Sequence, residues 1–85
     1  MLIRIHPHAY KHGLSSDQIL AAYESGLPTI RVRERDRDTE PQRYALIGWS
    51  DTGLPLELCL VRTDFGVLIF HANYLTESFR KEFYQ

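Results

Sequence analysis

The stretch RYALIGWSDTGLPLELCLVRTDFGVLIFHAN, residues 43–73, consists of three apolar runs separated by two turn sequences. The runs have the length and composition of β-strands and cover residues 43–49, 55–62 and 66–73. Gly53 and Gly66 end the two turn sequences, and glycine accepts the positive φ that tight turns often need. From Thr29 onward Ile30 and Val32 alternate with arginines, which predicts one more strand. The sequence therefore predicts a four-stranded antiparallel meander.

Two helices are predicted on either side of these strands. The first begins with a capping box, in which the Ser15 hydroxyl reaches the Gln18 amide and the Gln18 side chain reaches back. Apolar residues then follow at helical spacing before the helix ends at Gly26 and Pro28: Ile19, Ala22 and Tyr23. Near the C-terminus, an amphipathic helix is indicated by the spacing of Leu75, Phe79 and Phe83.

A short strand at residues 2–5 and a helical turn at residues 9–12 complete the expected order of elements. Helices packed on one face of an antiparallel sheet define the α+β class, which we predict for residues 1–85 as a single domain.

The chain has 85 residues, with ten Lys and Arg against eleven Asp and Glu, so its net charge is −1. This length excludes large enzyme architectures. The charge balance argues against nucleic-acid binding through overall charge, but it permits a local basic stripe. A core this small gains stability from a partner chain, so we expect one.

The single cysteine and the N-terminus indicate the compartment. Cys59 cannot form an internal disulfide, and we interpret it as a packing residue of a central strand. The first six residues include a charge and no long apolar run, so they predict neither a signal peptide nor a membrane span. We therefore expect a cytoplasmic protein.

Four arginines alternate along the chain and admit two interpretations. On one strand face they would form a positive ridge spaced roughly 6.6 Å apart, suited to RNA phosphates. Acidic residues interleave with them, however, so a neutral solvated loop or a charge-protected edge strand is the alternative. The arginines are Arg31, Arg33, Arg35 and Arg37, and the acids are Glu34, Asp36 and Asp38.

His71 is the main candidate for acid–base chemistry, because histidine titrates near neutral pH. It lies two residues before Asn73 on a predicted strand, so both side chains should project from the same face. Alternatively, His71 packs against Tyr74 or Phe79. For Asn73 we favour a role as the cap of the C-terminal helix over a catalytic role.

Other residues also have two interpretations. A metal site could be drawn from His6, His8 and His12, but no acidic or cysteine ligand follows at a diagnostic spacing, so we expect no metal or other cofactor. Trp49 could stack on a base or serve as a core or interface anchor. The candidates for exposed apolar anchors toward a partner are Leu27, Trp49, Leu54 and Phe65.

Three segments together span nearly the whole chain: KHGLS at 11–15, RYALIGWSDTG at 43–53 and IFHAN at 69–73 with the helix after it. In the same order, they resemble segments of the BrnT-type toxins of bacterial type II toxin–antitoxin modules. This resemblance implies the RelE-like ribonuclease fold, RNA as substrate and a BrnA-like antitoxin, expected to be a ribbon-helix-helix protein. A homodimer is a further candidate assembly.

The resemblance also implies where the active site lies. We expect metal-independent RNA cleavage with His71 as the acid or base, and with Arg80, Arg43, Lys11 and His12 holding the phosphate. Further RNA contacts are expected from Arg31, Arg33, Arg35 and Trp49. The family has a serine at the position of His71 and an arginine at that of Asn73, so the alternative function is a catalytically degenerate binding or regulatory module.

Overall fold

The structure of the chain is a computed structural model that describes residues 1–84. Within these residues, five strands and two α-helices form the fold, joined in part by short 3-10 helices. The strands are β1 (Leu2–Ile5), β2 (Arg31–Val32), β3 (Arg43–Trp49), β4 (Pro55–Thr63) and β5 (Gly66–Tyr74). The α-helices are α1 (Ser16–Gly26) and α2 (Glu77–Phe83), and the 3-10 helices are η1 (Pro7–Tyr10), η2 (Leu27–Thr29) and η3 (Glu34–Asp36). In the part of the chain that is described, no helix is long and apolar enough to cross a membrane.

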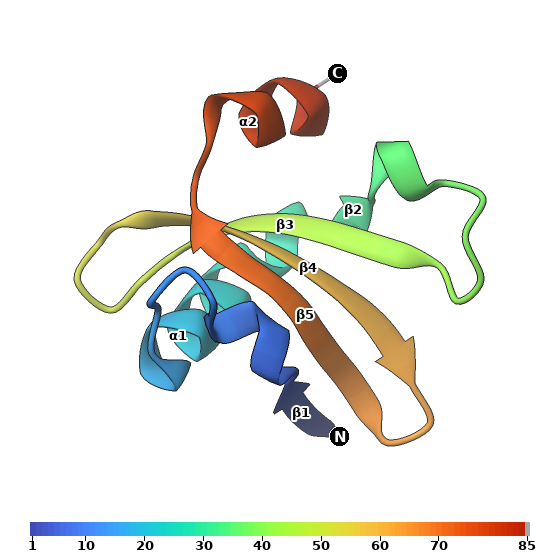
Figure 1. The fold of residues 1–85 in the computed structure, drawn as a ribbon, viewed down its shortest axis with the longest axis horizontal. Helices are drawn as coiled ribbons and strands as arrows, with labels where there is room; N and C mark the ends of the chain where they lie inside the picture. Colours follow the sequence, from blue (N-terminus) through green and yellow to red (C-terminus); the bar gives the residue numbers. More distant parts are fainter. Residues whose placement is uncertain (85) are drawn as a thin grey trace.

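The strands make one mixed sheet in the order β1-β5-β4-β3-β2 (Figure 1). β1 pairs in parallel with β5, whereas the other neighbouring pairs are antiparallel. The α+β class is confirmed, but the N-terminal strand is part of the same sheet and makes it mixed. Parallel neighbours need a long connection, and here the rest of the domain supplies it.

Helix α1 packs on one face of the sheet through its capped, amphipathic sequence. Both hydrogen bonds of the predicted capping box between Ser15 and Gln18 are present. The helix lies so close to β3 that a Cβ at Gly48 would overlap the carbonyl oxygen of Ala22. This face holds the larger core, which includes Ile19, Ala22, Leu46, Leu58, Leu60 and Ile69.

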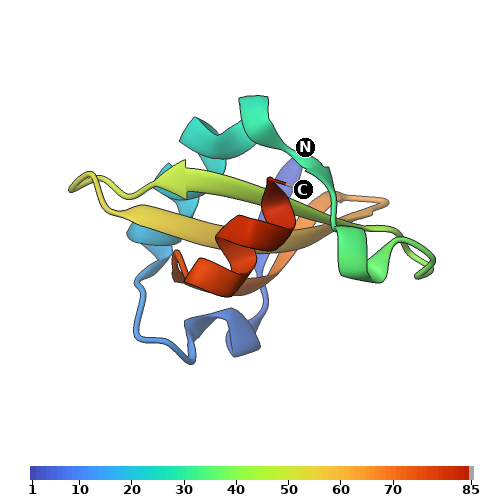
Figure 2. The same ribbon diagram turned by 90° about the horizontal axis from the view of Figure 1, so that it is seen from above.

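Helix α2 lies on the opposite face, so the prediction that the helices share one face is wrong (Figures 1 and 2). A second core forms there from Ala45, Ile47, Cys59, Phe79 and Phe83. Both faces of β3 and β4 carry apolar side chains, as is typical of strands that are buried on two sides. Each face therefore needs its own cover, and each helix supplies one.

A β-bulge in β5 determines which side chains reach the α2 face. Leu60 lies opposite Ile69, but the preceding Cys59 lies opposite His71, so Phe70 is an extra residue in β5. In simple alternation, His71 would share the α1 face with Ile69. Because of the bulge, His71 shares the α2 face with Cys59 instead.

The exposed edge of β3 beyond β2 is covered by two hydroxyl groups. Thr29 Oγ1 accepts a hydrogen bond from the Ile47 N–H, and Ser25 Oγ accepts one from the Trp49 N–H at 2.8 Å. The pairing of β2 with β3 stops at Arg31, which lies opposite Ala45, and the two hydroxyl groups take the place of a strand along the rest of β3. The edge therefore has its donors satisfied without a longer β2.

Candidate functional site

The candidate site is built around a buried carboxylate on β4. Glu57 is only 4% exposed, although it lies in a strand of apolar residues. Its Oε2 atom is 2.8 Å from Nε2 of His71 on β5, whose side chain is 24% exposed. The Glu57 carboxylate is therefore buried, whereas the His71 ring that it contacts is partly open to solvent. Neither interpretation of His71 from the sequence included this carboxylate partner.

The second carboxylate oxygen of Glu57 is bound by Thr76, directly before α2. Oε1 accepts hydrogen bonds from the Thr76 backbone N–H at 2.7 Å and from the Thr76 hydroxyl at 2.6 Å. The same hydroxyl accepts a bond from the Phe79 N–H and so caps α2. The cap predicted at Asn73 is therefore wrong, because Asn73 Oδ1 accepts from the Tyr74 N–H instead.

The ionisation of Glu57 is determined by these partners. Burial raises the pKa of Glu57, but hydrogen bonds from His71 and Thr76 lower it further than burial raises it. The pKa therefore lies below its ordinary value, and the carboxylate is ionised at neutral pH.

His12 joins this pair from the N-terminal segment. The His6 N–H donates to the Ile69 carbonyl, which holds the chain after β1 against β5. The loop after η1 then places the His12 ring beside His71, with the ring centroids 6.0 Å apart and the planes at 78°. Two of the predicted site residues, His12 and His71, are thus brought together.

Lys11 and Arg80 are exposed cations near these elements in the chain. Lys11 directly precedes His12, and Arg80 lies on α2 one turn after its cap at Thr76. Their side chains form no hydrogen bond or ion pair with any residue between 1 and 84. Both are therefore available to an anion.

The predicted arginine ridge does not form. The strand β2 ends at Val32, and the chain then turns through η3, so the four arginines do not share a strand face. Arg33 bonds Asp36 at 3.1 Å, and Arg37 bonds both carboxylate oxygens of Glu34. Asp36 and Glu34 therefore neutralise these two cations, which agrees with the alternative interpretation of this segment as a neutral solvated loop.

Of the other predicted phosphate contacts, Arg31 and Arg43 are engaged elsewhere and Arg35 is not. Arg31 lies over the Phe83 ring at 4.3 Å and donates to the Phe83 carbonyl at 2.8 Å. Arg43 lies over the Phe70 ring and is 3.6 Å from Asp36. Arg35 is exposed. Thus Arg31 and Arg43 serve mainly to attach neighbouring segments.

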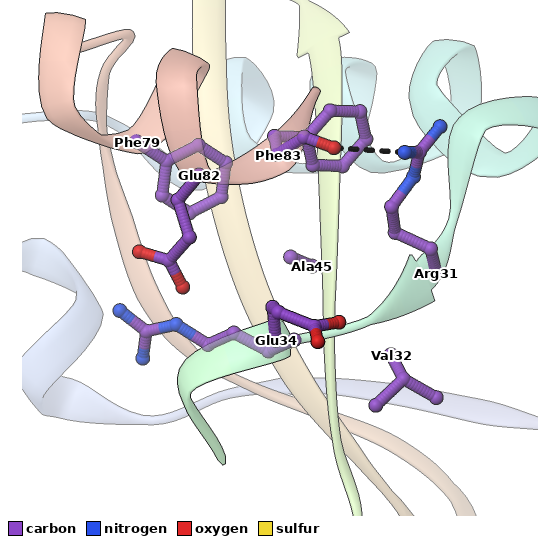
Figure 3. Close-up of a pocket in the computed structure, with 8 residues that line it drawn as sticks. Arg31, Val32, Glu34, Ala45, Phe79, Glu82 and Phe83 are labelled. Atoms are coloured by element: carbon purple, nitrogen blue, oxygen red, sulfur yellow. Dashed lines mark hydrogen bonds between the residues drawn. The ribbon is translucent and has the colours of Figure 1, made fainter. Parts of the chain in front are cut away.

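Figure 3 shows the pocket that separates the β2–η3 segment from α2. Its cavity volume is about 60 Å³. Glu34 and Glu82 line it above an apolar base that includes Ala45 and Phe79. It does not include Glu57 or His71, so this small pocket is separate from the candidate site.

The structure also places the remaining candidates. Trp49 is 55% exposed, which excludes the core interpretation, and the other three predicted apolar anchors are exposed as well.

His6 Nδ1 accepts from the His8 N–H, and within residues 1–84 no three His, Cys, Asp or Glu side chains are grouped to hold a metal. Cys59 is buried, and this burial raises the pKa of its thiol to about 12, so it is not a nucleophile.

The sequence interpretation missed Glu57 and Thr76. Glu57 was visible as a lone carboxylate within the apolar run 54–61, and a buried charge needs partners. Thr76 was visible as a capping residue directly before Glu77.

Chemically, the site combines an oriented imidazole with a second imidazole, and the exposed cations Lys11 and Arg80 are close to its residues along the chain. This set can transfer protons to and from an anionic substrate and can bind its charge. Comparison of the chain with models of protein families, with curated proteins and with solved structures gives no match.

Proposed function

We propose that this protein is the toxin of a type II toxin–antitoxin module and cleaves RNA without a metal ion, with His71 as the acid or base. The observation that carries the proposal is the Glu57–His71–His12 cluster, in which a buried carboxylate orients one imidazole beside another. Paired imidazoles with different environments suit the two proton transfers that RNA cleavage requires.

In the proposed reaction, one imidazole takes the proton of a 2′-hydroxyl group. The 2′-oxygen then bonds to the adjacent phosphorus, and the bond from phosphorus to the 5′-oxygen breaks. The other imidazole, protonated beforehand, gives its proton to the leaving 5′-oxygen. His71 and His12 fill these two roles, while Lys11 and Arg80 bind the phosphate oxygens as charge develops.

The three segments that resemble BrnT-type toxins also support this function. KHGLS contributes Lys11 and His12, and IFHAN contributes His71, so two of these segments meet in the cluster. The partner would be a ribbon-helix-helix antitoxin of the BrnA kind. The four exposed anchors Leu27, Trp49, Leu54 and Phe65 give such a partner apolar surface to bury.

A second candidate function is a catalytically degenerate binding or regulatory module. It is favoured by the engagement of Arg31, Arg33, Arg37 and Arg43 in contacts within the chain, since a nuclease needs free cations for RNA. The net charge of −1 points the same way.

Inducible expression of the chain alone separates the two functions. The toxin function predicts growth arrest with loss of RNA, which His71→Ala and Arg80→Ala abolish. His8→Ala is the matched control, because the structure gives the His8 side chain no hydrogen bond among residues 1–84. A chain that causes no arrest would overturn the nuclease and leave the binding module. A ribbon-helix-helix protein encoded in the adjacent reading frame would favour the toxin.

A further inference from the structure

Both oxygens of the Glu57 carboxylate are engaged by named partners. Oε2 contacts His71 Nε2, and Oε1 accepts two hydrogen bonds from Thr76. An ionised carboxylate only accepts hydrogen bonds, so the hydrogen in the contact with His71 belongs to Nε2. The neutral ring is then the Nε2–H tautomer, and its free lone pair is on Nδ1.

Thr76 fixes which carboxylate oxygen faces His71. Its backbone N–H and its hydroxyl both donate to Oε1, so the oxygen on that side is always an acceptor. The hydroxyl lone pair also accepts from the Phe79 N–H. The cap of α2 and the orientation of His71 therefore depend on the same carboxylate.

We infer that Glu57 and Thr76 are positioning residues, which hold His71 as the Nε2–H tautomer and leave Nδ1 to exchange protons with the substrate. This arrangement also makes the orientation of His71 depend on the seating of α2. The inference rests on the proposed function only for its consequences for activity, because the tautomer itself is a property of the free protein.

Packing alone does not account for Glu57. Its neighbours along β4, Leu56 and Leu58, are fully buried, and an apolar residue would suit the second core beside Cys59. A buried carboxylate loses hydration, and its pairing often does no more than offset that loss. What Glu57 adds is a defined arrangement of His71 and Thr76.

The decisive variant is Glu57→Gln. Thr76 presents two donors, so the amide oxygen of the substituted side chain must face Thr76 and its NH₂ group must face His71. The His71 Nε2 then has to accept a hydrogen bond, which inverts the ring to the Nδ1–H tautomer. An analogous carboxylate-to-amide change in serine proteases lowers kcat about 10⁴-fold by favouring the wrong tautomer.

The test is nitrogen NMR of the histidine rings in the full chain, together with the rate of RNA cleavage. We expect Nε2–H for His71 in the parent chain, Nδ1–H in Glu57→Gln, and a cleavage rate at least about 100-fold lower in that variant. Thr76→Val removes one of the two hydrogen bonds that hold the carboxylate but leaves it an acceptor, so the tautomer should stay Nε2–H while the Nε2 proton exchanges faster with water and the cleavage rate falls by less than in Glu57→Gln. Thr76→Ser keeps the hydroxyl and should keep the tautomer, the proton exchange and the rate of the parent chain. Glu77→Gln removes the same charge from the exposed first turn of α2 and should change none of these.

An Nδ1–H tautomer in the parent chain, or an unchanged tautomer in Glu57→Gln, would overturn the inference. If Glu57→Gln does not fold, the comparison of Thr76→Val with Thr76→Ser decides: equal rates of exchange of the His71 Nε2 proton with water in these two variants would overturn the positioning role of Thr76. A parent chain that shows the expected tautomers but cuts no RNA would refute the proposed nuclease while supporting the positioning role.

Discussion

Glu57 and His71 are diagonal neighbours in the ladder between β4 and β5. Glu57 lies opposite Asn73, and His71 lies opposite Cys59, yet the Glu57 carboxylate reaches His71 Nε2 at 2.8 Å. Diagonal contacts of this kind are within reach of long side chains on one sheet face. The contact exists because the bulge at Phe70 moves His71 to the face that Glu57 occupies.

The pH dependence of stability should report Glu57. Its pKa in the folded chain lies below the ordinary value of 4.5, so its contribution to stability is complete above that pH and is lost as the pH falls through the folded pKa. We expect the free energy of unfolding of Glu57→Gln to approach that of the parent chain progressively as the pH falls below 4.5. Urea unfolding over a series of pH values measures this, with Glu77→Gln as the control. If the difference in free energy of unfolding between Glu57→Gln and the parent chain stayed constant at acid pH, the lowered pKa of Glu57 would be contradicted.

Gly48→Ala should strongly destabilise the fold. The new methyl group would overlap the backbone carbonyl of Ala22, which cannot move without displacing α1, and we expect a loss of about 3 kcal/mol. Gly53→Ala is the matched control, because its surroundings are open and only its positive φ of 85° disfavours alanine, at about 1 kcal/mol. Thermal or urea unfolding of the two variants compares these costs. Equal losses would show that α1 does not approach β3 this closely.

RNA affinity should depend on the free cations and not on the paired arginines. In a His71→Ala background, which prevents cleavage, Lys11→Ala and Arg80→Ala should each weaken binding and reduce the salt dependence by about 0.7 in the log–log slope. Arg37→Ala should change neither, because hydrogen bonds to Glu34 engage its guanidinium and raise its pKa. Titration of labelled single-stranded RNA at several salt concentrations provides the measurement. If Arg37→Ala weakened RNA binding more than Arg80→Ala, the result would support the arginine ridge as the RNA-binding surface.

Loss of the hydroxyls at the β3 edge should promote association of the chain. Thr29→Val leaves the Ile47 N–H without its partner and should cost about 1 kcal/mol. With Ser25→Ala added, the edge also loses its cover at Trp49 and can pair with another strand. Size-exclusion chromatography over a range of concentrations detects the association. Ser16→Ala, which removes an exposed hydroxyl of α1 without a bond to the edge, should remain like the parent chain.

The sequence predicted the elements whose signals are local. The capping box between Ser15 and Gln18 and the turn at Gly53 depend on neighbouring residues alone, and both occur as predicted. Local ion pairs also explain the failed ridge, because Arg33 with Asp36 and Arg37 with Glu34 stabilise a turn in place of a strand.

The features that the sequence did not reveal depend on register. One missed feature did have a signal in the sequence. Ala45, Leu46 and Ile47 follow one another in β3, and consecutive apolar residues in a strand indicate burial on both faces and hence a helix on each side of the sheet. The partner of Glu57 could not be read in this way. It depends on one extra residue in β5, and a bulge leaves no clear mark in an apolar run.

The parallel pairing of β1 with β5 has a consequence for protein synthesis. Of the five strands, β1 is synthesised before the others and has to wait for β5, and the loop that carries His12 meets His71 only when β5 has emerged. Long-range pairing of this kind forms late in folding. An unfinished chain therefore carries no assembled site, and whatever chemistry the site performs begins only after translation of the whole domain.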